Sequence, residues 1–141
     1  MNEMTIDEMN IGDMASTKKT ISESDVYLFA GITGDLNPAH TDEISASNGI
    51  FHGRVAHGIL VTGLISAVLG MKLPGPGTIY LGQEVKFTKP VYFGDTITAT
   101  CTVSSIRPEK NIVNFETICT NQKGETVISG IATVMPPKKS V

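Results

Sequence analysis

The chain has 141 residues, of which 40% are hydrophobic and 18% are charged, and its formal net charge is -3 at pH 7. This length and composition predict one compact globular domain, residues 1–141. The 11 lysines and arginines are scattered rather than clustered, which argues against nucleic acid as a partner. No apolar run approaches the roughly 18 residues that cross a bilayer, so a membrane-spanning protein is excluded.

The first ten residues are acidic and lack the apolar centre of a secretory signal, so we expect a cytoplasmic protein. Cys101 and Cys119 both fall in segments with β character. We interpret them as thiols of the core, with a disulfide between them as the alternative.

Helices are predicted in the first half of the chain. Ser22 followed by Asp25 resembles a capping box that opens a helix running to about Ile32. A short helical turn is expected over 42–47 and a long helix over about 57–69. The long helix is apolar on nearly all sides, so we expect it in the middle of the molecule, covered on more than one side.

The second half of the chain predicts an antiparallel sheet. The alternation of apolar residues and threonines from Thr96 to Val103 is typical of a strand with one face in solvent. Short turns at 93–95, 107–110 and 121–124 favour pairing between consecutive strands. A long apolar helix before such a meander indicates an α+β fold in which the sheet wraps the helix. The expected strands are 78–90, 95–107, 111–121 and 125–134.

Residues 34–41 form a loop that can carry acid and base chemistry. Pro38 interrupts a regular helix, and it stiffens the loop between Asp35 and His40 so that both side chains can face one point. A carboxylate beside an imidazole can transfer protons near neutral pH, and Asn37 can hold a water molecule. The alternative is that Asp35 and Asn37 serve only as turn and cap residues.

A metal site built from Asp35, His40 and Asp42 is a further alternative, but no other ligand completes such a set nearby, so we expect no metal.

The start of the long helix, at Gly58, is a candidate anion site. Its free N–H groups and the helix dipole can stabilise an oxyanion, and a donor of this kind contributes about 3 kcal/mol in comparable sites. The alternative for Gly58 is helix packing alone. We interpret His57 as a hydrogen-bonded core residue. Ser66 either bonds back to the carbonyl of Thr62 or reaches toward the loop that carries Asp35.

The segment from Phe29 to Gly70 resembles the MaoC-like (R)-specific enoyl-CoA hydratase family. The family's Ala-His-Gly falls on residues 56–58, and the later turn with Pro-Val and Gly-Asp falls on 90–95. The likeness covers most of the chain. The family's first motif falls on Gly34, Asp35, Asn37, Pro38, His40 and Asp42.

This resemblance implies a hot-dog fold and a hydro-lyase that converts enoyl-CoA to (3R)-3-hydroxyacyl-CoA. It implies that Asp35 and His40 are catalytic, that Ser66 supports them, and that the Gly58 N–H meets the thioester oxygen. It also implies a homodimer, or a dimer of dimers, that binds acyl-CoA near the subunit interface. No cofactor is implied apart from the CoA of the substrate.

Two points stay open within the resemblance. The segment 48–54 is richer in glycine than the family pattern, which leaves the acyl-chain length undetermined. Candidates for the CoA phosphates are Arg54, Lys86 and Lys89. The competing functions are a hot-dog thioesterase, an acyl-carrier-protein dehydratase and a non-catalytic acyl-CoA binding module.

Overall fold

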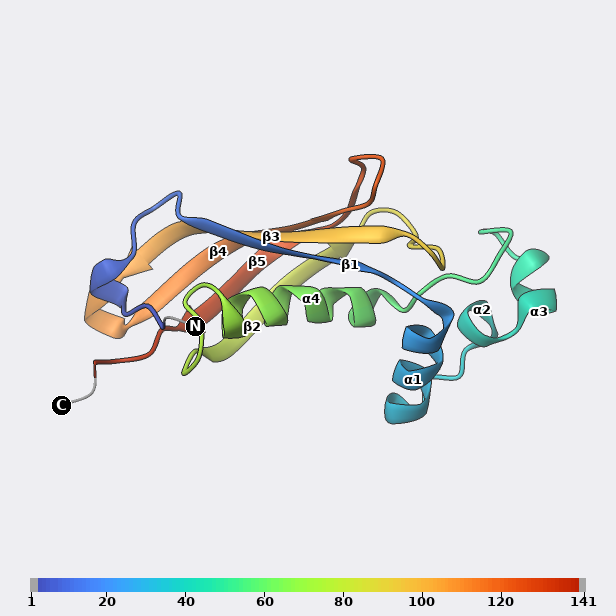
Figure 1. The fold of residues 1–141 in the computed structure, drawn as a ribbon, viewed down its shortest axis with the longest axis horizontal. Helices are drawn as coiled ribbons and strands as arrows, with labels where there is room; N and C mark the ends of the chain where they lie inside the picture. The colour runs from blue at the N-terminus through green and yellow to red at the C-terminus, as the bar shows by residue number, and fades with distance from the viewer. Residues whose placement is uncertain (1–2, 140–141) are drawn as a thin grey trace.

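The computed structural model describes residues 3–139 (Figure 1). Residues 1–2, which belong to the N-terminal segment interpreted above, and residues 140–141 lie outside the described residues. The elements in chain order are η1 (Ile6–Glu8), β1 (Met14–Thr20), α1 (Glu23–Thr33), α2 (Pro38–Thr41), α3 (Glu43–Ser47), α4 (Gly58–Met71), β2 (Ile79–Phe87), β3 (Thr96–Arg107), η2 (Pro108–Lys110), β4 (Ile112–Thr120) and β5 (Thr126–Met135).

The five strands form one antiparallel sheet in the order β1-β3-β4-β5-β2. The four predicted strands are confirmed, and the turns at 107–110 and 121–124 do join neighbours. The expectation for the turn at 93–95 was wrong, because β2 and β3 lie apart in the sheet and β2 pairs with β5 instead. Strand β1 was not foreseen. Its sequence, MASTKKT, has no apolar alternation because it lies at an edge of the sheet.

Helix α4 lies across one face of the sheet (Figure 1). Its inner face, which includes Val61, Ile65 and Val68, is fully buried in the core. The expectation that this helix is covered on more than one side was wrong, since its opposite face is exposed. The exposed residues on that face are Ile59, Gly63, Ser66 and Ala67. The sheet therefore supports α4 from one side only within the single chain.

Helices α1, α2 and α3 gather at the N-terminal end of α4 (Figure 1). The predicted capping box is confirmed: Ser22 Oγ accepts from Asp25 N at 3.1 Å, and Asp25 Oδ2 accepts from Ser22 N at 2.9 Å. Gly34 ends α1 with a φ of 79°, a left-handed conformation that favours glycine. The chain then turns back toward α4. It does so just before the residues expected to carry the chemistry.

The expectation that residues 34–41 contain no helix was wrong for the second half of this segment. Pro38 begins the four-residue helix α2. Proline is accepted at the first position of a helix because its missing N–H would have no partner there. The helix carries His40 in its only turn, so the imidazole is held by regular backbone.

Cys101 and Cys119 are free thiols buried in the core, as expected. Burial raises the pKa of each thiol to about 12. Within residues 3–139, no helix is both long and apolar enough to cross a membrane.

Candidate active site

Asp35 follows the left-handed turn at Gly34, and its side chain is about half exposed, at 52%. Its Oδ1 accepts a hydrogen bond from Asn37 N at 3.3 Å, which holds the carboxylate over its own loop. The Asn37 side chain in turn accepts from Ala39 N at 3.0 Å and caps α2. The cap role that was the alternative for Asn37 is therefore the one observed. Asn37 does not line the cavity described below.

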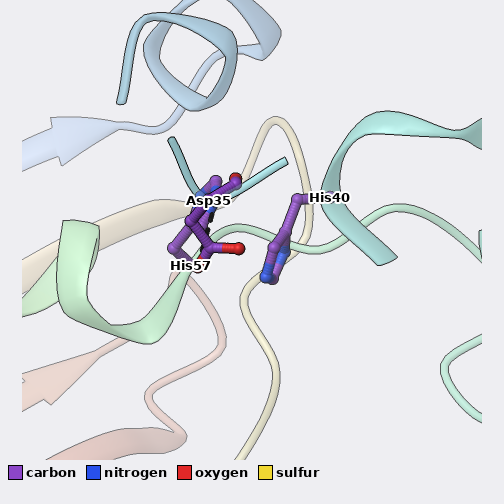
Figure 2. A group of neighbouring side chains, drawn as sticks. All are labelled: Asp35, His40 and His57. Atoms are coloured by element: carbon purple, nitrogen blue, oxygen red, sulfur yellow. Dashed lines mark hydrogen bonds and ion pairs between the residues drawn. The ribbon is translucent and has the colours of Figure 1, made fainter. Parts of the chain in front are cut away.

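His40 points from α2 toward Asp35. Its Nδ1 lies 2.6 Å from the carbonyl oxygen of Val55. A carbonyl can only accept, so Nδ1 carries the hydrogen and donates it. The neutral ring then keeps a lone pair on Nε2, on the opposite edge. Figure 2 shows the Asp35 carboxylate and the His40 ring directed toward each other.

His57 touches both of these residues. Its side chain is only 3% exposed, and its Nε2 donates to the carbonyl oxygen of Asp35 at 2.9 Å. Its ring lies against that of His40, with 3.9 Å between centroids and 30° between planes (Figure 2). The core position was expected from the sequence, whereas the contacts with Asp35 and His40 were missed. The sequence places this histidine directly before α4, but no local pattern shows which loop its ring faces.

A cavity of about 390 Å³ brings Asp35, His40 and Gly58 together. The rest of its wall is mostly apolar and includes Phe51 and Phe87. The His57 side chain does not cap α4, so the amide of Gly58, the first helical residue, has no side-chain acceptor there. A positive helix end beside a carboxylate and an imidazole, in apolar surroundings, can stabilise an oxyanion while protons move.

Gly58 is also packed tightly. A Cβ atom at this position would lie 2.5 Å from a ring carbon of Phe87. The alternative interpretation of Gly58, that glycine is needed for packing, therefore holds alongside its place in the cavity wall.

The remaining candidates are not all at the cavity. Ser66 lies two turns further along α4, exposed and outside the cavity lining, so a single chain does not bring it to Asp35 and His40. Arg54 does not line the cavity, so its assignment to the CoA phosphates stays a prediction. Its guanidinium is committed to Glu43 at 2.7 Å and Glu23 at 3.3 Å.

The two lysines differ in position. Lys86 is exposed on β2 and does not line the cavity. Lys89 lines it, and its ammonium lies 2.5 Å from Glu125 at the surface. Lys89 is therefore the candidate cation nearest to the site.

Asp42, the third residue of the alternative metal set, points elsewhere. Its carboxylate caps α3 and accepts from Ile44 N at 3.0 Å and Ser45 N at 3.3 Å. The set with Asp42 was wrong. Asp35, His40 and His57 do each offer a ligand atom within 4.8 Å of the others.

Known proteins resemble this chain over most of its length. Residues 9–124 match the family model of the MaoC like domain. The chain is 54% identical over 133 residues to an (R)-specific enoyl-CoA hydratase of Rhodospirillum rubrum, covering 94% of this chain and 92% of that protein. It is 42% identical over 133 residues to a 3-hydroxybutyryl-CoA dehydratase of Methylorubrum extorquens, covering 94% and 84%.

Among solved structures, the R-hydratase PhaJ1 from Pseudomonas aeruginosa in the unliganded form superposes with a TM-score of 0.92. It shares 42% identity, and the match covers 97% of this chain and 88% of that one. The matched residues span the loop with Asp35 and His40, helix α4 and most of the sheet. The chain therefore belongs to the MaoC-like dehydratase family and has its hot-dog fold.

Proposed function

We propose that this protein is an (R)-specific enoyl-CoA hydratase, which reversibly adds water to trans-2-enoyl-CoA and gives (3R)-3-hydroxyacyl-CoA. The observation that carries the proposal is the convergence of the Asp35 carboxylate and the His40 ring on one cavity that also contains Gly58. The relatives named for hydratase and dehydratase activity support it. Because acyl-CoA is the substrate, we place the reaction in the cytoplasm.

The tautomer of His40 suggests how protons move. With Nδ1–H donated to Val55, Nε2 is an acceptor, and the Asp35 carboxylate is a second one. One water molecule can donate a hydrogen to each, which leaves its oxygen lone pair free for the β-carbon of the enoyl thioester. His40 Nε2 accepts one proton as the new C–O bond forms. The electrons of the double bond move to the thioester oxygen.

The resulting enolate is stabilised by the Gly58 N–H and the positive end of α4. The imidazolium of His40 then returns its proton to the α-carbon, so that one water has been added and both side chains recover their first state. Asp35 holds the water and faces the imidazolium as its counter-charge. We propose that no metal or cofactor takes part, because each proton has a donor and an acceptor within this set. Dialysis against a chelator should then leave turnover unchanged.

We further propose that the protein is a homodimer joined through strand β2. The outer edge of β1 is protected by exposed Lys18 and Lys19, a common defence against edge pairing. Strand β2 pairs only with β5 within the described chain, and exposes Leu81 at 49% and Phe87 at 52%. Burying such an edge against a second copy satisfies its backbone and covers its apolar side chains. Leu81→Lys should give monomers by sedimentation, while Met14→Lys on β1 should not.

The direct test of the activity follows the absorbance of crotonyl-CoA together with free thiol. Loss of enoyl absorbance without thiol release is the expected result. Thiol release would replace the proposal with a thioesterase, and no change with several chain lengths would indicate a binding module. The buried thiols of Cys101 and Cys119, with pKa values of about 12, should not react in the assay.

Two matched pairs of variants test the site. Asp35→Asn should lower kcat at least ~100-fold, the scale of a positioned acid or base. Asp42→Asn makes the same chemical change nearby and should not lower kcat, because asparagine caps a helix as well as aspartate. His40→Asn keeps a donor near the Val55 carbonyl but removes Nε2. Its kcat should be lower than the wild-type value by a similar factor. His52→Asn, at an exposed histidine outside the cavity, is its control.

A further inference from the structure

We infer that His57 is a positioning residue that sets the geometry of both members of the acid–base pair at once, an inference that rests on the proposed hydratase function. Its N–H fixes the Asp35 backbone from one side, and its ring face supports the His40 ring from the other. His57 lines the cavity but is only 3% exposed, and we assign it no direct contact with the substrate. It acts only through Asp35 and His40.

A hydrogen bond joins the His57 ring to the backbone of Asp35. Nε2 of His57 lies 2.9 Å from the Asp35 carbonyl oxygen but 3.9 Å from Oδ2 of the same residue. The short contact is to the backbone, so the bond orients the loop and leaves the carboxylate free to bind water. A carbonyl accepts only, which fixes the hydrogen of the neutral His57 ring on Nε2.

The His57 ring also contacts two other rings. Its centroid lies 3.9 Å from that of His40, with 30° between planes, and 4.8 Å from that of Phe29 of α1, with 56° between planes. The His40 ring is tied along one edge by Nδ1 to the Val55 carbonyl, a bond about which it could still tilt. The flat face of His57 limits that tilt and so directs His40 Nε2 at the same point as Asp35.

His57 also has a polar ring atom that a residue needed only for packing would lack. Nδ1 of His57 is buried and has no hydrogen-bond partner among residues 3–139. An unpaired buried nitrogen destabilises the folded state. Phenylalanine would fill the same apolar space without it. The histidine is therefore better explained by its Nε2–H and its contact with His40 than by packing.

Two substitutions separate these contacts. His57→Phe keeps a ring against His40 and loses the donor, while His57→Gln places an amide N–H near the position of Nε2 and loses the ring. We expect kcat for crotonyl-CoA to fall about tenfold or more in each, with KM within about threefold of wild type, because orientation is lost and binding is not. His57→Phe removes one unpaired nitrogen and one hydrogen bond, so its melting temperature should stay close to the wild-type value.

The decisive measurement is a double-mutant cycle with Asp35→Asn. If His57 acts through Asp35, adding His57→Phe to Asp35→Asn should lower kcat by much less than it lowers the wild-type value. Full additivity, or a wild-type kcat in both His57 variants, would overturn the inference. Should His57→Phe be unstable, the cycle is run with His57→Gln. An inactive wild-type protein would instead reject the hydratase function, which keeps the two failures apart.

Discussion

The carbonyl oxygen of Val55 accepts the Nδ1 hydrogen of His40 at 2.6 Å, and this one bond decides which nitrogen of His40 faces the cavity. Val55 is itself held on both sides: its N–H donates to the Ala39 carbonyl at 3.1 Å, and its backbone bridges to Tyr92. Helix α2 and the strand-like entry to α4 are thus joined by paired backbone. The orientation of the imidazole is built into the fold before any substrate binds.

This bond predicts a specific tautomer of His40. Nitrogen-15 NMR of the neutral ring should show the hydrogen on Nδ1 for His40 and on Nε2 for His57, because each donates to a carbonyl oxygen. His52, which has neither contact, serves as the reference. A hydrogen on Nε2 of neutral His40 would contradict the proposed path of the proton.

Gly58 should be required for reasons of space. Alanine is normally preferred over glycine in a helix, by about 0.5–1 kcal/mol, so Gly58→Ala would stabilise an open site. Here the added Cβ would lie 2.5 Å from the Phe87 ring, which must move; because that ring is 52% exposed, we expect a small destabilisation, about 1 kcal/mol, in urea unfolding. The loss should shrink in a Phe87→Ala background, since the ring is the obstacle. Equal losses of unfolding free energy with Phe87 and in the Phe87→Ala background would show that the Cβ does not clash with the Phe87 ring.

Lys89 should contribute to CoA binding. Lys89 lines the cavity, and its ammonium, now paired with Glu125, would form a charge-assisted contact with a CoA phosphate. Lys89→Ala is expected to raise KM for crotonyl-CoA about tenfold, equivalent to about 1.4 kcal/mol, with little change in kcat. Lys86→Ala, away from the cavity, is the matched control. Added salt should weaken wild-type binding more than binding by the Lys89 variant, and equal salt effects would argue against the contact.

The protein should lose stability in acid. The Ser22 backbone N–H, followed by the Lys19 ammonium, lowers the pKa of the Asp25 carboxyl below its usual value of 3.8, and Lys89 lowers that of Glu125. A carboxyl with a lowered folded-state pKa stabilises the fold above its unfolded pKa and loses that effect as pH falls through the folded value. The melting temperature should therefore fall between about pH 4 and pH 2. The melting temperature of Asp25→Asn should fall less steeply with pH than that of the wild type. Parallel curves for the two proteins would exclude Asp25 as a contributor to the loss.

Local sequence signals predicted the elements of this fold well because they act within a few residues. The capping box at Ser22 and the turn at 121–124 are examples, since both depend on neighbouring backbone. The position of β2 could not be inferred in this way. Its pairing with β5, with Val85 opposite Gly130, joins segments that are far apart in the chain. Local turn chemistry at 93–95 carries no information about that partner.

At the site, too, local features could be predicted from the sequence and contacts between distant segments could not. Asp35 and His40 were predicted from one short loop and from the family resemblance, and Gly58 from the polarity of a helix end as well. The structure places all three at one cavity. The role of His57 was missed, because its contacts depend on how α4 meets the loop in space. The ion pairs of Arg54 were not foreseen for a similar reason: its partners Glu23 and Glu43 come from α1 and α3.

The cavity described above is closed by residues from opposite ends of the chain: Asp35 and Gly58 are made early, whereas Val127 and Ile128 of β5 are among the last. On the ribosome, the loop and helix end therefore emerge well before part of the cavity wall. A nascent chain stopped before β5 would carry Asp35, His40 and Gly58 without the wall residues Val127 and Ile128.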